Sequence, residues 1–547
     1  MAKKTGEWAN KLYYGDNLDV LREHVPDESV DLIYLDPPFN SNRSYNVLFK
    51  EKTGEDSPAQ IQAFDDTWTW SQETEMLYIA MMTGPASNRV KDALEAMRKL
   101  LGDNDVLAYL VMMTARLVEL HRVLKPTGTI FLHCDPTASH YLKMILDAIF
   151  GIRNFRNEVI WKRSTAHSDT KQGSRQMGRI HDVVLFYSKG NTWTWNPIYT
   201  PYDEAYILSK YRFIEEGTGR RYRKGDLTAG KPGGDTSYEW KGVRPYKGRY
   251  WAYSRQKMEE FEAEGRLVYT STGMPEFKRY LDEMPGVPLQ DLWTDIDPIN
   301  SKAAERLGYP TQKPLPLLER IVQSCSNEGD IVLDPFCGCG TTIDAAEKLK
   351  RRWIGIDITT LAIDLIDARL RHTYGEWITA SYEIEGIPKD LSGARALFAR
   401  SPFEFERWCV MMVDGQPNDR QVGDRGVDGV IRIPTDARGG SDRILVSVKG
   451  GATQPGHVRD LVGTVASERA AMGVFITMRA PTKAMMEAAR HSGVYTYPVN
   501  GQKYPLVQII TVEELLAGKR PSMPATLLPY FQAVRRYDNA GNQTGLF

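Results

Sequence analysis

The sequence has 547 residues, with 69 lysines and arginines against 70 aspartates and glutamates, which gives a net charge of -1. This length predicts two or more domains. A charged fraction of 25% beside 42% hydrophobic residues excludes a highly charged disordered chain, and no apolar run is long enough to span a membrane. The five cysteines show no metal-ligand spacing and residues 1–6 lack an apolar signal core, so we expect a cytoplasmic protein.

The first candidate for catalysis is a turn that follows an apolar strand predicted over residues 29–34. The turn reads Asp36-Pro37-Pro38-Phe39. Its two prolines lack a backbone N–H, so the loop presents carbonyl acceptors beside the Asp36 carboxylate, and Phe39 adds a flat face. These groups suit a planar ring that carries an amino group, although a rigid turn alone would also explain the prolines.

The next part of the chain is predicted to be a polar, irregular segment over 41–70, followed by two helices. The irregular segment is either a lid over the substrate or a surface excursion. The helices are predicted over 72–100 and 105–124, and a strand over 129–135 follows them. We expect the polar end of that strand to have a structural or pocket-wall role.

Residues 151–260 differ in composition from the remainder of the chain. They hold 21 lysines and arginines against 12 aspartates and glutamates, and tyrosines and tryptophans lie between the basic residues. Basic side chains can contact phosphates, and aromatic rings can stack on bases. The segment therefore indicates nucleic-acid contact, although a run such as 220–224 could equally be a solvated surface.

A second turn with chemical character follows an apolar strand predicted over 331–334. Gly338 and Gly340 lie in this turn and let the backbone approach a ligand closely. A helix over 343–349 follows, and then a strand that ends at Asp357. This order is typical of a nucleotide-binding unit in which the terminal acid binds ribose hydroxyls. Neither a GxGxxG motif nor a GxxxxGK[ST] loop is present, which favours an adenosine without a phosphate chain.

Together the two turns resemble the motifs of amino DNA methyltransferases. The sequence DPPF at 36–39 is similar to the catalytic motif, and DPFCGCGTT at 334–342 is similar to the S-adenosylmethionine motif. The catalytic motif comes first, as in the beta class, and PTQKP at 310–314 is similar to a further signature of that class. The resemblance implies that Asp36, Pro37, Pro38 and Phe39 are catalytic. It also implies a set of cofactor-binding residues: Asp16, Thr311, Lys313, Asp334, Phe336, Gly338, Gly340, Thr341 and Asp357.

This resemblance sets the expected activity and fold. We expect a Rossmann-like α/β methyltransferase with permuted motifs and an inserted target-recognition region. It would transfer a methyl group from S-adenosylmethionine to DNA by base flipping, in restriction-modification or defence. Adenine N6 is the favoured acceptor, and cytosine N4 stays open. Double-stranded DNA is the expected partner, and a homodimer stays open as well.

The C-terminal part of the chain predicts a second α/β domain. A helix over 403–408 and strands over 444–449 and 472–477 flank the sequence at 423–431. This order resembles an Mrr-type restriction endonuclease domain of the PD-(D/E)xK class. The expected boundaries are a methyltransferase domain over 1–385 with its recognition insert over 151–300, a linker over 386–400, an endonuclease-like domain over 401–520 and a tail over 521–547.

The same resemblance implies metal-dependent chemistry in the second domain. Asp428 would bind Mg²⁺ with help from Glu406, and Lys449 would position the attacking water or stabilise charge. Ser447 departs from the pattern, because the family has Glu, Asp or Gln at that position and a hydroxyl is a weaker metal ligand. Two alternatives therefore stay open, a bifunctional methyltransferase and nuclease, or a binding regulator with vestigial catalysis.

Overall fold

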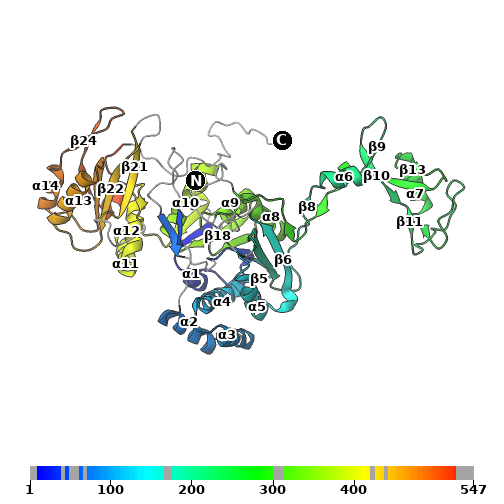
Figure 1. Cartoon of the computed structure of the whole chain (residues 1–547), viewed down its shortest axis with the longest axis horizontal. Coiled ribbons are helices and arrows are strands. Elements are labelled where there is room, and N and C mark those ends of the chain that lie inside the picture. The colour runs from blue at the N-terminus through cyan, green and yellow to red at the C-terminus, as the bar shows by residue number, and fades with distance from the viewer. Residues whose placement is uncertain are drawn as a thin grey trace. The chain divides into compact units, whose positions relative to one another are not determined.

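The computed structural model of the chain has two compact units. One unit comprises Met1–Asn196 and Asp291–Phe547, and the other comprises Pro197–Gln290 (Figure 1). The structure describes residues 9–38, 44–47, 61–65, 70–164, 175, 177–299, 312–418, 426–435 and 441–524, with only the backbone at 44–47 and 61–65. None of the helices in these ranges has the length and apolar character needed to cross a membrane.

A nine-stranded sheet organises the larger unit, in the order β16-β6-β7-β5-β2-β17-β18-β1-β19. All neighbouring strands run parallel except β7, which is antiparallel to β5 and β6. This mixed, mostly parallel sheet confirms the predicted Rossmann-like fold. Its strands are β1 (Asn10–Tyr14), β2 (Val30–Leu35), β5 (Leu124–Cys134), β6 (Phe155–Lys162), β7 (His181–Ser188), β16 (Leu292–Trp293), β17 (Ile331–Asp334), β18 (Arg352–Asp357) and β19 (Tyr382–Glu385).

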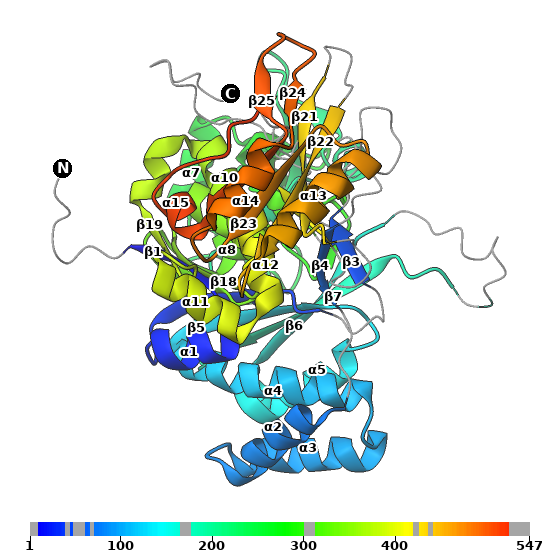
Figure 2. The same cartoon turned by 90° about the vertical axis from the view of Figure 1, so that its left-hand side faces the viewer.

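Helices pack on both faces of this sheet. Figure 2 shows α4 and α5 along one side, with α2 and α3 beyond them, and α8 and α10 on the other side. The helix predicted over 72–100 is interrupted between Gly84 and Ser87, because Pro85 cannot continue the hydrogen-bond pattern. The helices are α1 (Asn17–His24), α2 (Gln72–Thr83), α3 (Asn88–Leu101), α4 (Asp105–Val123), α5 (Ser139–Phe150), α8 (Leu315–Cys325), α9 (Thr341–Lys348) and α10 (Thr360–Tyr374).

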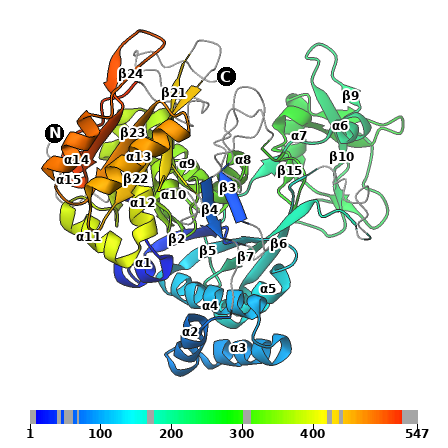
Figure 3. The same ribbon diagram turned by 60° about the vertical axis from the view of Figure 1, so that its left-hand side comes forward.

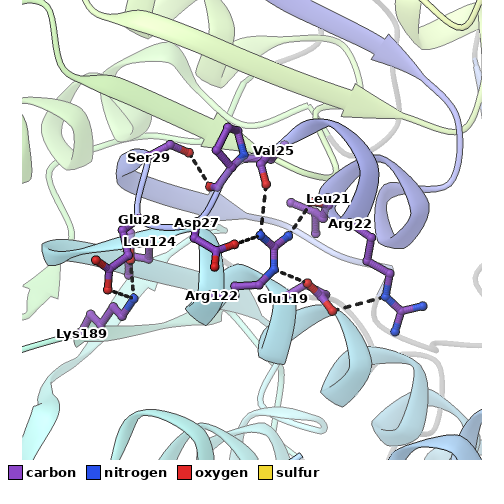
Figure 4. Close-up of polar contacts among 11 residues, drawn as sticks. Leu21, Arg22, Val25, Asp27, Glu28, Ser29, Glu119, Arg122, Leu124 and Lys189 are labelled. Atoms are coloured by element: carbon purple, nitrogen blue, oxygen red, sulfur yellow. Dashed lines mark hydrogen bonds and ion pairs between the residues drawn. The ribbon is translucent and has the colours of Figure 1, made fainter. Parts of the chain in front are cut away.

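The turn that leads from α1 into β2 is held by Arg122 at the end of α4 (Figure 4). Its guanidinium group donates to the carbonyl oxygens of Leu21 (2.6 Å) and Val25 (3.2 Å) and pairs with the carboxylate of Asp27. The last carbonyls of a helix have no partner within the helix, so these bonds satisfy them. Arg122 thereby fixes the start of the strand that carries Asp36 at its other end.

The C-terminal part of the larger unit contains a second sheet, in the order β20-β21-β22-β23-β26. Helices α12 and α13 pack against it, and α14 lies beside α13 and β26. The predicted second α/β domain is therefore present, and the expected linker over 386–400 is largely helix α11. The elements are α11 (Leu391–Arg400), α12 (Pro402–Met411), β20 (Gln416–Pro417), β21 (Gly429–Pro434), β22 (Ser441–Lys449), α13 (Pro455–Ser467), β23 (Met472–Thr477), α14 (Lys483–Arg490), β24 (Val494–Thr496), β25 (Lys503–Pro505), β26 (Val507–Thr511) and α15 (Val512–Leu516).

The smaller unit has its own apolar core, in which Trp240, Trp251 and Phe261 are buried. This unit spans fewer residues than the expected insert over 151–300, because β6 and β7 belong to the main sheet. Its elements are β8 (Tyr199–Thr200), α6 (Glu204–Lys210), β9 (Phe213–Ile214), β10 (Arg221–Asp226), β11 (Thr228–Ala229), β12 (Tyr250–Trp251), α7 (Arg255–Ala263), β13 (Leu267–Tyr269), β14 (Pro275–Tyr280) and β15 (Val287–Pro288).

The sequence predicted an irregular segment over 41–70, but part of this segment forms strands. Its described part forms an antiparallel ribbon of β3 (Ser44–Val47) and β4 (Ile61–Asp65).

Candidate active site

The two turns singled out from the sequence lie next to each other in the structure. Strands β2 and β17 are parallel neighbours, with Leu32 paired to Val332, so their carboxyl ends emerge at the same edge of the sheet. A cavity of about 460 Å³ opens there, within the usual size range of small-molecule sites. Parallel α/β sheets bind ligands at this edge, outside the carboxyl ends of the strands.

Asp36 stands at the end of β2 with its two carboxylate oxygens in different surroundings. Oδ2 accepts from the Lys313 ammonium group at 2.5 Å, and both side chains are nearly buried, with 14% and 11% of their surfaces exposed. Oδ1 is buried and has no hydrogen-bond partner in the described structure. An unpartnered buried acceptor is costly, so this oxygen is suited to a donor brought by a ligand.

A buried chain of polar groups lies next to the turn that holds Asp36. The hydroxyl of Tyr34 lies 3.0 Å from Nδ1 of His133, whose Nε2 lies 3.1 Å from the carboxylate of Asp182. Arg163 pairs with the same carboxylate at 2.9 Å. Burial raises the pKa of the Tyr34 hydroxyl well above its ordinary value, so it stays protonated. His133 therefore acts within a structural network, as expected for this strand end.

Two acids shape the turn after β17. The Asp334 carboxylate accepts from the Phe336 amide at 3.0 Å. Asp357, at the end of β18, accepts from the amide of Gly338 at 2.9 Å and from the amide and hydroxyl of Thr359, each at 2.9 Å. Burial is the main cause that raises the pKa of Asp334 to about 7 and the pKa of Asp357 to about 6.

The turn also depends on a glycine and on a buried ion pair. Gly340 has a φ of +75°, and an added Cβ would lie 2.7 Å from the Ile366 side chain, so a larger residue does not fit. Arg369 donates to the hydroxyl of Thr341, the first residue of α9, at 3.2 Å and pairs with Asp344 at 2.9 Å. These contacts bind α10 to the start of α9.

Asp16 lies on a third strand end, after β1. Its carboxylate caps α1 by accepting from the Leu18 amide at 2.7 Å, and it pairs with the buried Arg116 at 2.9 Å. The neighbouring Asn17 side chain donates to the Pro335 carbonyl oxygen at 2.7 Å. Asp16 is thus a helix cap and also part of the cavity wall.

Most of the site residues expected from the sequence line this single cavity. Pro37 and Gly340 are described but do not line it, and Phe39 and Thr311 lie outside the described residues. The expected residues on the wall are Asp16, Asp36, Pro38, Lys313, Asp334, Phe336, Gly338, Thr341 and Asp357.

Other lining residues were not anticipated from the sequence. They include Asn17, Tyr34, Arg116, Gln312, Ile358, Thr359, Phe403, Glu404 and Arg407. Arg116 had a weak signal, since it is a cation among apolar residues in the middle of helix α4. Nothing in the local sequence relates 403–407 to this cavity.

Two of the nuclease candidates, Asp428 and Lys449, lie together at the end of β22. Asp428 accepts from the Val448 amide at 2.6 Å, and the Lys449 ammonium group lies 3.5 Å from the same oxygen. Ser447 is buried, and Glu406 lies on α12. Among the residues that the structure describes, no cluster of three or more His, Cys, Asp or Glu side chains could hold a metal ion, so the expected Mg²⁺ finds no support.

Two family models match the chain. One is described as a DNA methylase and matches residues 30–367. The other is described as a NACHT-associated inactive restriction endonuclease and matches residues 403–517. The second match supports an endonuclease-like domain but not the Mrr-type assignment that was expected.

The chain is also similar to curated relatives and to solved structures. The type II methyltransferase M.EcaI of Enterobacter cloacae is 29% identical over 68% of this chain and 72% of its own. The Mod subunit of the type III restriction-modification enzyme StyLTI of Salmonella typhimurium is 28% identical over 62% of this chain, which spans only half of that protein. The cytosine-N4-specific PvuII DNA methyltransferase aligns with a TM-score of 0.32 and 14% identity over 68% of this chain and 92% of its own.

Proposed function

Since the chain belongs to the DNA methylase family, we propose that it methylates an exocyclic amino group of a base in double-stranded DNA. We further propose that S-adenosylmethionine is the methyl donor and that the protein serves a restriction-modification system. One observation carries this proposal: the turn with Asp36 and the turn with Asp334 border the same cavity at adjacent strand ends. A methyl acceptor and a methyl donor must meet in such an arrangement.

The groups around the cavity fit this donor. Buried acceptors at Asp334 and Asp357 suit a ligand with hydroxyl and ammonium donors and a sulfonium charge. Phe336 offers an aromatic face, and the glycine turn lets the backbone approach closely. S-adenosylmethionine would supply an electrophilic methyl group, and Asp334, Phe336, Gly338 and Asp357 are the residues that we expect to hold it.

Asp36 is the proposed catalytic residue because it lines the cavity and its Oδ1 has no hydrogen-bond partner among the described residues. The lone pair of an exocyclic amine is delocalised into the base ring. A hydrogen bond from the amine to Asp36 Oδ1 would draw the nitrogen toward tetrahedral geometry and free that lone pair. Lys313 fixes the orientation of the carboxylate through Oδ2. The target base must leave the duplex to reach this turn.

Adenine N6 is the acceptor that we favour, because an asparagine follows DPPF at position 40. Cytosine N4 presents the same NH2 geometry and is the alternative. The test is transfer of a labelled methyl group from S-adenosylmethionine to unmethylated DNA by the purified chain, followed by sequencing that distinguishes the two modified bases. Label on adenine N6 at a fixed sequence supports the proposal. Label on cytosine N4 overturns the choice of base, and an absence of label overturns the function.

For the C-terminal domain we propose a role that does not require DNA cleavage. Ser447 provides a hydroxyl where the nuclease pattern has Glu, Asp or Gln, and a hydroxyl is a weaker ligand for a hard divalent ion. The oxygen of Asp428 that faces Lys449 already accepts a hydrogen bond from the Val448 amide. The likeness to a family described as inactive supports the same reading.

A further inference from the structure

Helix α12 of the endonuclease-like domain takes part in the wall of the methyltransferase cavity. Phe403, Glu404 and Arg407 line it, together with the turns after β17 and β18. The helix packs beside α10, where the Thr360 hydroxyl donates to the sulfur of Met411 at 3.4 Å (Figure 3). The second domain therefore contributes side chains to a site whose other walls come from the first domain.

Glu404 lines the cavity beside the strand ends that bind the adenosine in our proposed function. Its carboxylate accepts from the hydroxyl of Tyr14 at 3.4 Å. Tyr14 is the partner of Asp357 in the β1–β18 ladder, and Gly15 donates to the Asp357 carbonyl oxygen at 2.9 Å. Glu404 is only 19% exposed, and Arg407 lies 3.6 Å from it. This carboxylate thus stands at the Asp357 end of the cavity.

The Asp357 carboxylate has too few open acceptor sites to bind both hydroxyl groups of a ribose. An ionised carboxylate has about four lone-pair sites. Asp357 already accepts three hydrogen bonds, from the Gly338 amide and from the amide and hydroxyl of Thr359. A ribose diol brings two donors, so Asp357 alone leaves one of them without a strong acceptor. Glu404 is a carboxylate on the same cavity wall that can supply it.

We propose that the endonuclease-like domain completes the cofactor site and that Glu404 accepts a hydrogen bond from a ribose hydroxyl of the methyl donor. Arg407 acts as a positioning residue for Glu404, and Phe403 forms part of the wall. This inference rests on the proposed function, because it takes an adenosyl methyl donor as the ligand. It gives the second domain a role in methyl transfer that needs neither a metal ion nor cleavage.

The decisive test compares ligands that differ by one hydroxyl group. Binding of S-adenosylhomocysteine and of its 2′-deoxy and 3′-deoxy analogues to the full chain is measured by calorimetry, for the wild type and for Glu404→Ala. We expect Glu404→Ala to bind S-adenosylhomocysteine about 10- to 100-fold more weakly, in line with a hydrogen bond to a charged group. The wild type should bind one of the two deoxy analogues more weakly than it binds S-adenosylhomocysteine. Glu404→Ala should bind that analogue at least as tightly as it binds S-adenosylhomocysteine. A purely structural role would weaken all three ligands equally and would overturn the proposal.

Two controls separate the inference from the function on which it rests. Glu487→Ala removes an exposed acid from α14 of the same domain and should leave affinity unchanged. Glu404→Gln keeps the shape of the side chain if the alanine variant does not fold. In the wild type, S-adenosylhomocysteine should slow amide hydrogen exchange in α12. If the wild type binds S-adenosylhomocysteine, and Asp357→Ala weakens this binding but Glu404→Ala does not, only this inference fails. If the wild type does not bind the ligand, the proposed function fails first.

Discussion

Asp36 combines an oxygen held by Lys313 with a second oxygen that has no partner in the described structure. Replacement by alanine removes the acceptor for the target amine but leaves the cofactor turn after β17 intact. We expect Asp36→Ala to lower the rate of methyl transfer by about 100-fold or more, which is typical of losing one positioned polar group in a dry site. The affinity for S-adenosylhomocysteine should change little.

Single-turnover kinetics and calorimetry on the same preparation check this expectation. Glu95→Ala, which removes a surface acid from α3, is a suitable control. A variant at Asp36 that keeps wild-type rates would remove this residue from the mechanism.

Asp334 and Asp357 make the binding of a cationic ligand dependent on pH. Burial raises their pKa values to about 7 and about 6, so in the free protein both carboxyl groups gain protons as the pH falls through this range. A sulfonium ion binds better to the ionised form. We therefore expect the affinity for S-adenosylmethionine to fall as the pH is lowered from 8 to 5.5, as calorimetry at several pH values would measure.

S-adenosylhomocysteine lacks the sulfonium charge and provides the matched comparison. Its affinity should fall less over the same interval, since it gains less from ionised acids. Parallel pH profiles for the two ligands would show that these carboxyl groups do not respond to the sulfonium charge.

At the level of single residues, the site residues that could be predicted are those that belong to a short local motif. Asp36 and Asp334 each follow an apolar strand and begin a turn with proline, and both lie on the cavity wall. Glu404 could not be predicted, because its position depends on packing between α10 and α12, and no local pattern encodes such a contact. Arg116 was missed for a similar reason, since its partner Asp16 lies on a distant strand end.

At the level of elements, the strands that carry the site could be predicted because each is a short apolar run that ends in a turn. β2, β17, β18 and β22 lie where the pattern placed them. Boundaries that depend on tertiary contacts differ more. Residues 391–400 form α11 because this helix packs against α12, although their composition suggested a linker.

The end of β22 gives a prediction about the second domain. Ser447 and Lys449 are two positions apart on the strand, as in the nuclease pattern that the sequence resembles, and the carboxylate of Asp428 lies 3.5 Å from Lys449. We expect the wild type to show no cleavage of methylated or unmethylated DNA with Mg²⁺ or Mn²⁺, as assayed on supercoiled plasmid. Ser447→Glu restores a carboxylate and tests whether the rest of the site is intact. Cleavage by the wild type that disappears in Asp428→Ala would restore the bifunctional alternative.

At the level of the whole molecule, the basic surplus of residues 151–260 does not translate directly into free positive charge. Arg220 pairs with Asp282 at 2.8 Å and with Glu283 at 2.8 Å, and Lys224 pairs with Glu276 at 3.0 Å. The run at 220–224 therefore serves the internal packing of the smaller unit more than its charge suggested. Sequence alone could not reveal this, because the acidic partners lie about 50 to 60 positions further along the chain.

The loop between β11 and β12 is a better candidate for phosphate contact. Lys231 and Lys247 are both exposed, and neither forms an ion pair within the described part of the unit. Each lysine that neutralises a phosphate releases condensed counterions, which contributes about 0.9 to the slope of log affinity against log salt. We expect Lys231→Ala with Lys247→Ala to weaken DNA binding and to reduce that slope by up to about 1.8. Fluorescence anisotropy over a salt series measures both quantities.

The double variant Arg89→Ala with Lys99→Ala on α3 changes the net charge equally and should leave the slope unaltered. Equal slopes for the wild type and the loop variant would show that this loop does not contact the DNA backbone.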